Sequence, residues 1–206
     1  MSTDTADSSA GQRGPADHAI REQIVAAAND HFRHYGYGKT TVSDLAKAIG
    51  FSKAYIYKFF ESKRAIGEAI CVQCLDEVLG EVTAAMPAAR TASDRLRIFM
   101  RTLPEVSARL FFNERELYDI AAYSVSEKWQ SSASYKERLL TLIQAIVLEG
   151  RASGEFERKT PLDETCRAIC QSMEPFCNPL MLQHNLDVVP EASDEVCRLV
   201  LRSLSP

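Results

Sequence analysis

The sequence lacks the long apolar runs that a membrane-spanning helix requires. Its uninterrupted apolar stretches are only a few residues long, as at residues 145–148, whereas about 20 consecutive apolar residues are needed to cross a bilayer. The first residues, MSTDTADSSAGQRGPAD, are polar and lack the apolar core of a secretory signal. We therefore expect a cytoplasmic protein that has no membrane partner.

Two further patterns are missing. The chain contains no useful length of alternating apolar and polar residues, which is the pattern of a half-buried β-strand, and its apolar residues recur instead at intervals of three and four. It also contains no glycine-rich phosphate loop, nucleophile elbow or HExxH metal motif. We predict an all-α protein that is not an enzyme, with no catalytic residues, no metal and no cofactor.

One stretch, residues 41–63, has the pattern of two short helices joined by a tight turn. Thr41 can cap a helix, and Asp44 stands three residues later, which is the spacing of a capping box. Gly50 can adopt the left-handed conformation that ends a helix, and Ser52 can cap the next one. An apolar anchor, Ile56, completes the requirements of a helix-turn-helix. The face of the first helix consists of Val42, Leu45, Ala46 and Ile49.

The second helix of this pair, expected over residues 52–59, has an outward side that carries positive charge. Lys53 and Lys63 each follow a capping serine, at the positive end of a helix, where a cation is disfavoured by about 0.3–1 kcal/mol. Cations at such positions indicate an anionic partner, and a DNA phosphate would also bind the free N–H groups of the helix start.

Positive charge is concentrated in this part of the chain. The whole protein has a net charge of −4, whereas residues 11–66 contain nine Lys and Arg against five Asp and Glu. Such charges also suit an ordinary solvated surface, so it is their combination with the helix pair that indicates DNA.

The remaining chain reads as a series of helices. We predict a disordered tail over residues 1–16, a helix-turn-helix domain over residues 17–64 and a second, helical domain over residues 65–206. Pro104 is expected to interrupt a helix capped by Ser93. The predicted helices cover residues 17–35, 62–85, 93–103, 105–112, 113–124, 129–151, 161–182 and 193–204.

The N-terminal third resembles the tetracycline-repressor (TetR) family of bacterial regulators. The match is strong over residues 20–70, on the motifs Thr40-Thr41-Val42, Asp44-Leu45-Ala46, Gly50-Phe51-Ser52-Lys53, Ile56-Tyr57-Lys58-Phe59-Phe60 and Ser62-Lys63. The resemblance implies an Ω-shaped homodimer with two DNA-reading heads, in which residues 65–206 form a helical effector-binding and dimerisation domain that holds a small ligand.

The resemblance also implies roles for individual residues of the head. Tyr57, Lys63 and Thr41 would bind phosphates, whereas Lys53, Ala54 and Tyr55 would lie toward base edges, where lysine suits guanine and an aromatic ring suits a thymine methyl. Family members often have Tyr or His where this chain has Phe59, and Lys58 would supply the missing contact. The predicted DNA-binding residues are Thr41, Ser52, Lys53, Ala54, Tyr55, Tyr57, Lys58 and Lys63.

The six cysteines and the later aromatic residues are the other distinctive features. Cys71 and Cys74 form a CxxC inside a helix without a second pair, which is a poor zinc pattern. Cys166, Cys170 and Cys177 fall on one helical stripe, where thiols usually pack as small apolar groups. An apolar effector pocket would be lined by Phe99, Leu103, Phe111, Tyr118, Tyr123, Trp129, Ile143, Met173 and Phe176.

These observations predict a ligand-responsive transcriptional repressor. It would bind a palindromic double-stranded DNA operator as a homodimer and be released by a small apolar effector. Two alternatives stay open: a redox or metal sensor that uses the cysteines, and an effector-free DNA-binding protein whose role is assembly.

Overall fold

The computed structural model describes residues 15–206, without the side chains of Pro15, Ala16 and Glu116. The predicted disordered tail falls on residues 1–14, which lie outside the described residues, and on residues 15–16, which begin the first helix. No β-strand occurs in the described part, so the all-α prediction is confirmed. The elements are α1 (Pro15–Tyr35), α2 (Val42–Ile49), α3 (Lys53–Ile56), α4 (Lys63–Ala85), η1 (Met86–Ala88), α5 (Ala92–Asn113), α6 (Arg115–Ser126), α7 (Gln130–Ser153), α8 (Leu162–Cys177), α9 (Pro179–Leu182) and α10 (Glu191–Ser203).

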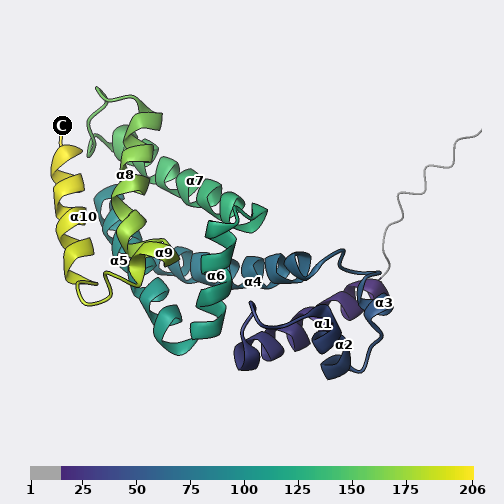
Figure 1. Ribbon diagram of the computed structural model, residues 1–206. Coiled ribbons are helices and arrows are strands. Elements are labelled where there is room, and N and C mark those ends of the chain that lie inside the picture. The colour runs from purple at the N-terminus through teal and green to yellow at the C-terminus, as the bar shows by residue number, and fades with distance from the viewer. Residues whose placement is uncertain (1–14) are drawn as a thin grey trace, which may run out of the picture.

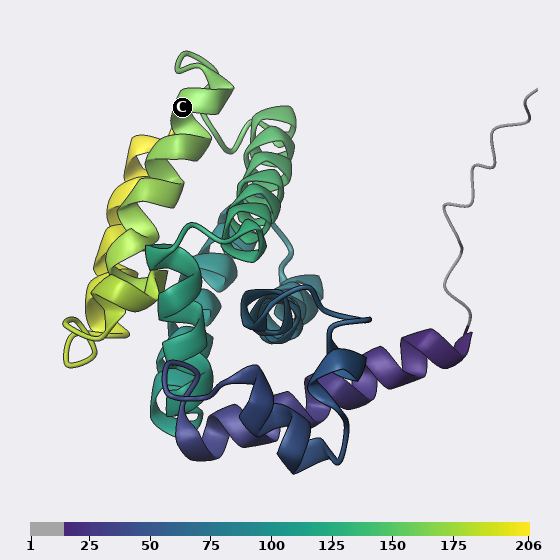
Figure 2. The same cartoon turned by 45° about the vertical axis from the view of Figure 1, so that its right-hand side comes forward.

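The helices form a small N-terminal head, α1 to α3, and a larger body, α5 to α10, which α4 connects (Figure 1). Figure 2 shows α4 nearly end-on, surrounded by helices of both parts. The first half of α4 contributes Ile66 and Ile70 to the core of the head, and the second half contributes Val78 and Val82 to the core of the body. One helix therefore belongs to both cores.

Four predicted helix boundaries in the body are wrong. α5 continues through Pro104, which is buried inside the helix, because packing of its ring in the core offsets the lost backbone hydrogen bond. Thr91 rather than Ser93 caps α5, since its hydroxyl accepts from Asp94 N at 3.0 Å. The single helix predicted over residues 161–182 is two helices, α8 and α9, separated at Asn178. The last helix begins at Glu191, so Ser193 lies in its first turn and is not its cap.

Glu155, in the turn after α7, acts as a second cap for α5. Its carboxylate accepts from the backbone N–H groups of Ser93 (3.0 Å) and Ala92 (3.1 Å) and from the Ser153 hydroxyl (3.0 Å). These hydrogen bonds, led by the one from the Ser93 N–H, hold the pKa of Glu155 at about 2. A side chain that is distant in the sequence thus fixes where α5 begins.

We expect Glu155→Gln to lower the free energy of unfolding at neutral pH by about 1 kcal/mol, which is typical for loss of a helix cap. Because the folded-state pKa lies below the ordinary value of 4.5, the carboxylate stabilises the fold above pH 4.5. That contribution is lost as the pH falls toward 2. Denaturant unfolding at a series of pH values should therefore show the two proteins converging in acid. The exposed Glu195→Gln is the matched control, and a constant difference at all pH values would contradict this role.

Candidate functional site

The helix pair of the head has the predicted local structure. Thr41 and Asp44 form a full capping box, with Asp44 N donating to the Thr41 hydroxyl at 3.2 Å and Thr41 N donating to the Asp44 carboxylate at 2.9 Å. Gly50 ends α2 with a φ of 76°, a left-handed conformation that suits glycine. The Ser52 hydroxyl accepts from Tyr55 N at 3.0 Å and so starts α3. Local side-chain chemistry therefore fixes the turn between the two helices.

The second helix is shorter than predicted. α3 ends at Ile56, and residues 57–59 continue as a turn held by backbone bonds such as Phe59 N to Ile56 O, 3.0 Å. Ile56 and Phe60 are buried under this unit. Its outer side carries Ser52, Lys53, Ala54, Tyr57 and Lys58, which are all exposed.

Tyr55 lies between this outer side and the core of the head. Its ring packs between the rings of Phe51 and Phe59, at centroid distances of 5.0 and 5.3 Å, and the ammonium of Lys58 lies 5.5 Å from its centroid. The half-buried ring therefore supports the exposed lysine. In the same way, the ammonium of Lys53 lies 5.8 Å from the centroid of the exposed Tyr57 ring.

Two predicted phosphate ligands, Thr41 and Lys63, make contacts within the head. The Thr41 hydroxyl donates to the Asp44 carboxylate at 2.6 Å. The Lys63 ammonium donates to the carbonyls of Tyr37 (3.0 Å) and Thr40 (3.1 Å), and burial lowers its pKa. Lys63 therefore holds the start of α4 against the turn between α1 and α2, and its third N–H is left for a further partner.

Arg21 of α1 is a further residue that holds the recognition unit. Its guanidinium donates to Phe59 O at 2.7 Å and lies 4.1 Å from the centroid of the Phe60 ring. The end of the turn after α3 is thus fixed to α1. The only sign of this contact in the sequence is a cation on an amphipathic helix.

The body contains a cavity of about 450 Å³ between α4, α5, α6, α7 and α8, with an apolar interior and an opening to the surface. This volume lies within the range of small-molecule sites, about 300–1,000 Å³. Five of the nine predicted effector residues line it: Phe99, Leu103, Tyr118, Ile143 and Met173. Further apolar wall comes from Leu75, Val78, Leu110, Ala121, Val125, Leu139, Leu140 and Leu162.

The other four predicted effector residues lie outside the cavity wall. Phe176 is buried in the core of the body, and Phe111 packs on the surface against Phe112 and Tyr118. Tyr123 and Trp129 face the head, where their rings lie 5.2 and 5.4 Å from the ring of Tyr37. Aromatic character alone did not separate pocket positions from packing positions, because both need large apolar side chains.

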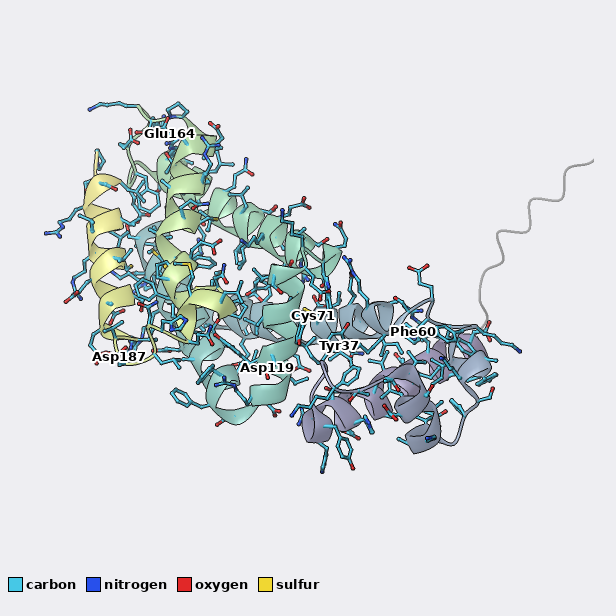
Figure 3. The ribbon with its side chains drawn as sticks, in the orientation of Figure 1. Tyr37, Phe60, Cys71, Asp119, Glu164 and Asp187 are labelled. Atoms are coloured by element: carbon cyan, nitrogen blue, oxygen red, sulfur yellow. The ribbon has the colours of Figure 1, made fainter. Side chains whose placement is uncertain are left out.

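Head and body meet around Tyr37, whose position beside α4 is labelled in Figure 3. Burial raises the pKa of Tyr37 to about 12, so its hydroxyl is neutral. Gly67 of α4 leaves room for the rings of Tyr37 and Trp129, since a Cβ at Gly67 would lie 2.8 and 2.9 Å from them. Trp129 N donates to Ser124 O at 2.8 Å, and Ser124 also lines the cavity. The cavity wall and the head junction therefore share the end of α6.

The wall of the cavity carries a partly exposed ion pair between α7 and α8. Lys136 of α7 donates to one carboxylate oxygen of Glu174 at 2.8 Å, and the Asn178 amide donates to the other at 2.7 Å. Burial acts to raise the pKa of Glu174, but the hydrogen bonds from Lys136 and Asn178 outweigh it and leave the pKa below its ordinary value. Glu174 is therefore an anion at the cavity wall.

The cysteines are free thiols, and three of them, Cys166, Cys170 and Cys177, line the cavity. Burial raises the pKa of these three thiols, to about 11 for Cys170, and it raises the pKa of the Cys74 thiol in α4 to about 12. These four thiols are therefore protonated at neutral pH.

Within residues 15–206, no group of three or more His, Cys, Asp or Glu side chains is arranged to hold a metal ion. No helix in the described part is long and apolar enough to cross a membrane.

Comparisons with known proteins match both parts of the chain. Residues 24–70 match the family described as bacterial regulatory proteins, tetR family, and residues 92–197 match the tetracyclin repressor-like C-terminal domain. The negative transcriptional regulator IcaR of the icaADBC biofilm operon of Staphylococcus aureus is 35% identical over 57 residues, which are 28% of this chain and 31% of IcaR. The match thus spans about a third of that relative.

Two solved structures show the same fold over nearly the whole chain. A tetR-family transcriptional regulator from Pectobacterium atrosepticum aligns with a TM-score of 0.76 and 17% identity, over 94% of this chain and 98% of that one. The regulator FadR from Bacillus subtilis, in complex with stearoyl-CoA, aligns with a TM-score of 0.61 and 18% identity, over 88% and 95%. At these identities the likeness concerns the fold alone.

Proposed function

Because this chain is a transcriptional regulator that belongs to the tetR family, we propose that it is a ligand-responsive repressor, which binds a palindromic operator as a homodimer and is released by a small apolar effector. The observation that carries the proposal is the combination of an exposed basic recognition unit with a cavity of about 450 Å³ in one chain. The cavity wall and the junction between head and body share the end of α6, which gives a physical route from the cavity to the head that carries the recognition unit.

The DNA-binding part of the proposal rests on the outer side of residues 52–58. Ser52, Lys53 and Ala54 would face base edges at the start of α3, while Tyr57 and Lys58 in the following turn would contact phosphates. Tyr55 would add an aromatic edge. Lys63 would use the N–H group that its two contacts within the head leave over, whereas the Thr41 hydroxyl would have to turn from Asp44 to a phosphate.

The homodimer is expected because a palindromic operator requires two heads related by a two-fold axis. α10 carries Leu199 with 60% of its surface exposed, so this apolar side chain would be available to a contact between subunits. Repression is supported by the IcaR relative, which is a negative regulator. Effector release is supported by the cavity, and FadR with its bound stearoyl-CoA shows a ligand on the same fold.

The two alternative functions have less support. The thiols along the cavity have raised pKa values, which disfavours the thiolate that redox sensing needs. An effector-free assembly protein has no use for an apolar cavity that opens to the surface. The effector-responsive repressor is therefore the function that the geometry supports best.

The experiment is a salt-dependent titration of the protein with DNA from around its own gene, with and without extracted cellular small molecules. Tight, sequence-selective binding that the extract releases is the expected result. Binding that is weak and independent of sequence at every salt concentration, for all fragments tested, would contradict the proposal.

Two variants test the recognition unit within the same titration. Lys58→Gln should lower the slope of log affinity against log salt by about one, because one fewer counterion is released. Tyr57→Phe removes a neutral hydroxyl and should weaken binding by about 0.5–1.5 kcal/mol with the slope unchanged. Lys159→Gln, an exposed cation of the body, is the control and should change neither value. Equal slopes for Lys58→Gln and the control would exclude a phosphate contact of Lys58.

A further inference from the structure

The ion pair in the cavity wall, Lys136 with Glu174, has one fixed member and one replaceable member. Glu174 is held at both carboxylate oxygens, and its side chain is 25% exposed. Asn178, which holds one oxygen, is itself fixed because its Oδ1 accepts from Leu180 N at 3.0 Å as the cap of α9. The Lys136 side chain is 55% exposed, so its ammonium can leave Glu174 for water at little cost.

From this arrangement we infer that the cavity takes a hydrophobic cation, which is an apolar molecule with one positively charged nitrogen that pairs with Glu174 in place of Lys136. The inference rests on the proposed function only in treating the cavity as the effector site. The apolar interior would hold the body of the ligand, and its charged end would stay beside the partly exposed carboxylate of Glu174.

The surroundings of Glu174 favour a cation over an anion. Glu174 lies in the last turn of α8, where the helix dipole attracts positive charge. The described lining residues also include Glu137 and Asp163, and among the lining residues only Lys136 and Arg167 are basic. Arg167 is already paired with Asp163 at 3.5 Å. An anionic ligand end that bound Lys136 would lie next to the fixed carboxylate of Glu174 and be repelled by it.

The apolar part of the cavity is compatible with this class of ligand. Phe99, Tyr118 and Tyr135 add aromatic surface, and aromatic faces attract cations as well as alkyl chains. A neutral ligand would gain from the same walls but would leave the Lys136 to Glu174 pair unused. Among ligands with alkyl chains of equal length, the carboxylate of Glu174 should therefore favour the one with a cationic end.

The test compares three probes with the same alkyl chain: decyltrimethylammonium, decanol and decanoate, each below its micelle-forming concentration. Binding to the full chain is measured by calorimetry without DNA. The cation is expected to bind about tenfold more tightly than the alcohol, as for one interaction with a charged group, and more tightly still than decanoate. Tightest binding of decanoate, or equal binding of all three, would overturn the inference.

Two variants of the ion pair give opposite expectations. Glu174→Gln keeps the size of the side chain and should remove the preference for the cation, with decanol binding unchanged. Lys136→Gln removes the competing ammonium, so decyltrimethylammonium should bind at least as tightly as to the natural chain. If the cavity were instead a site for anions held by Lys136, the same substitution would abolish binding of decanoate. Glu164→Gln, an exposed acid of α8, is the control. If Glu174→Gln unfolds, the Lys136→Gln result alone still supports or overturns the inference.

Operator release is measured separately, so that failure of the ligand class and failure of the function can be told apart. Selective cation binding without release of any operator would leave the ligand class standing and overturn the effector role. Operator release by a cell extract, combined with no preference for the cation in calorimetry, would leave the function standing and overturn the ligand class.

Discussion

Replacing Trp129 with alanine is expected to lower the free energy of unfolding by about 3–5 kcal/mol, the usual cost of removing a fully buried tryptophan. The Trp129 side chain is 0% exposed and packs edge-on to the Tyr37 ring at 5.4 Å. Its Nε1 donates to the Glu127 carboxylate at 2.9 Å, and this bond is lost as well. Trp129 is the only tryptophan of the sequence, so the variant has no tryptophan fluorescence to follow. Unfolding in denaturant should therefore be followed by circular dichroism.

The control for this prediction is Phe112→Ala. Phe112 is also a large aromatic residue of the body, but 68% of its surface is exposed, so its removal should change stability by less than about 0.5 kcal/mol. An equal effect of the two substitutions would mean that the site of Trp129 collapses without leaving a cavity.

The importance of Trp129 follows from where the core of the head ends. Leu117, Ile120 and Trp129 come from the part of the chain that was predicted to form a separate body, yet they belong to the same buried cluster as α1, α2 and α3. The ion pair between Arg33 and Glu114, 3.1 Å, joins the two parts at the surface. Head and body are thus packed against each other, and α6 is in direct contact with the head.

The predictions that were confirmed in the head concern interactions between residues close in the sequence. The capping box at Thr41, the left-handed Gly50 and the Ser52 cap each depend on neighbours within three or four residues. Short-range hydrogen bonds of this kind are set by residue type and spacing. Such interactions can therefore be predicted from the sequence alone.

The predictions that differ from the structure depend on partners distant in the sequence. Helical periodicity shows that a face is buried but not which residues bury it, so Tyr123 and Trp129 were assigned to the cavity although they pack on Tyr37. Pro104 was expected to end a helix, because nothing local shows that its ring lies in the core. The pairing of Lys136 with Glu174 spans 38 residues and has no local pattern.

Gly67→Ala is expected to lower the free energy of unfolding by about 1–2 kcal/mol, although alanine is the better helix former. The new methyl group would lie 2.8 Å from the Tyr37 ring and 2.9 Å from the Trp129 indole, so two buried rings would have to move. Gly80→Ala in the same helix is the control. It has no atom within 4 Å of its new methyl group and should stabilise the protein by about 0.5–1 kcal/mol.

The two junction substitutions should not be additive. In a Trp129→Ala background the indole contact at Gly67 is gone, and the Tyr37 ring can move into the space that the indole leaves. Gly67→Ala should then be neutral or stabilising, and the difference from its effect in the natural chain measures the packing between α4 and the start of α7. Unfolding of the four proteins of this cycle by denaturant gives that difference directly. An unchanged cost of Gly67→Ala in both backgrounds would mean that the Tyr37 ring alone, held by the head, resists the new methyl group.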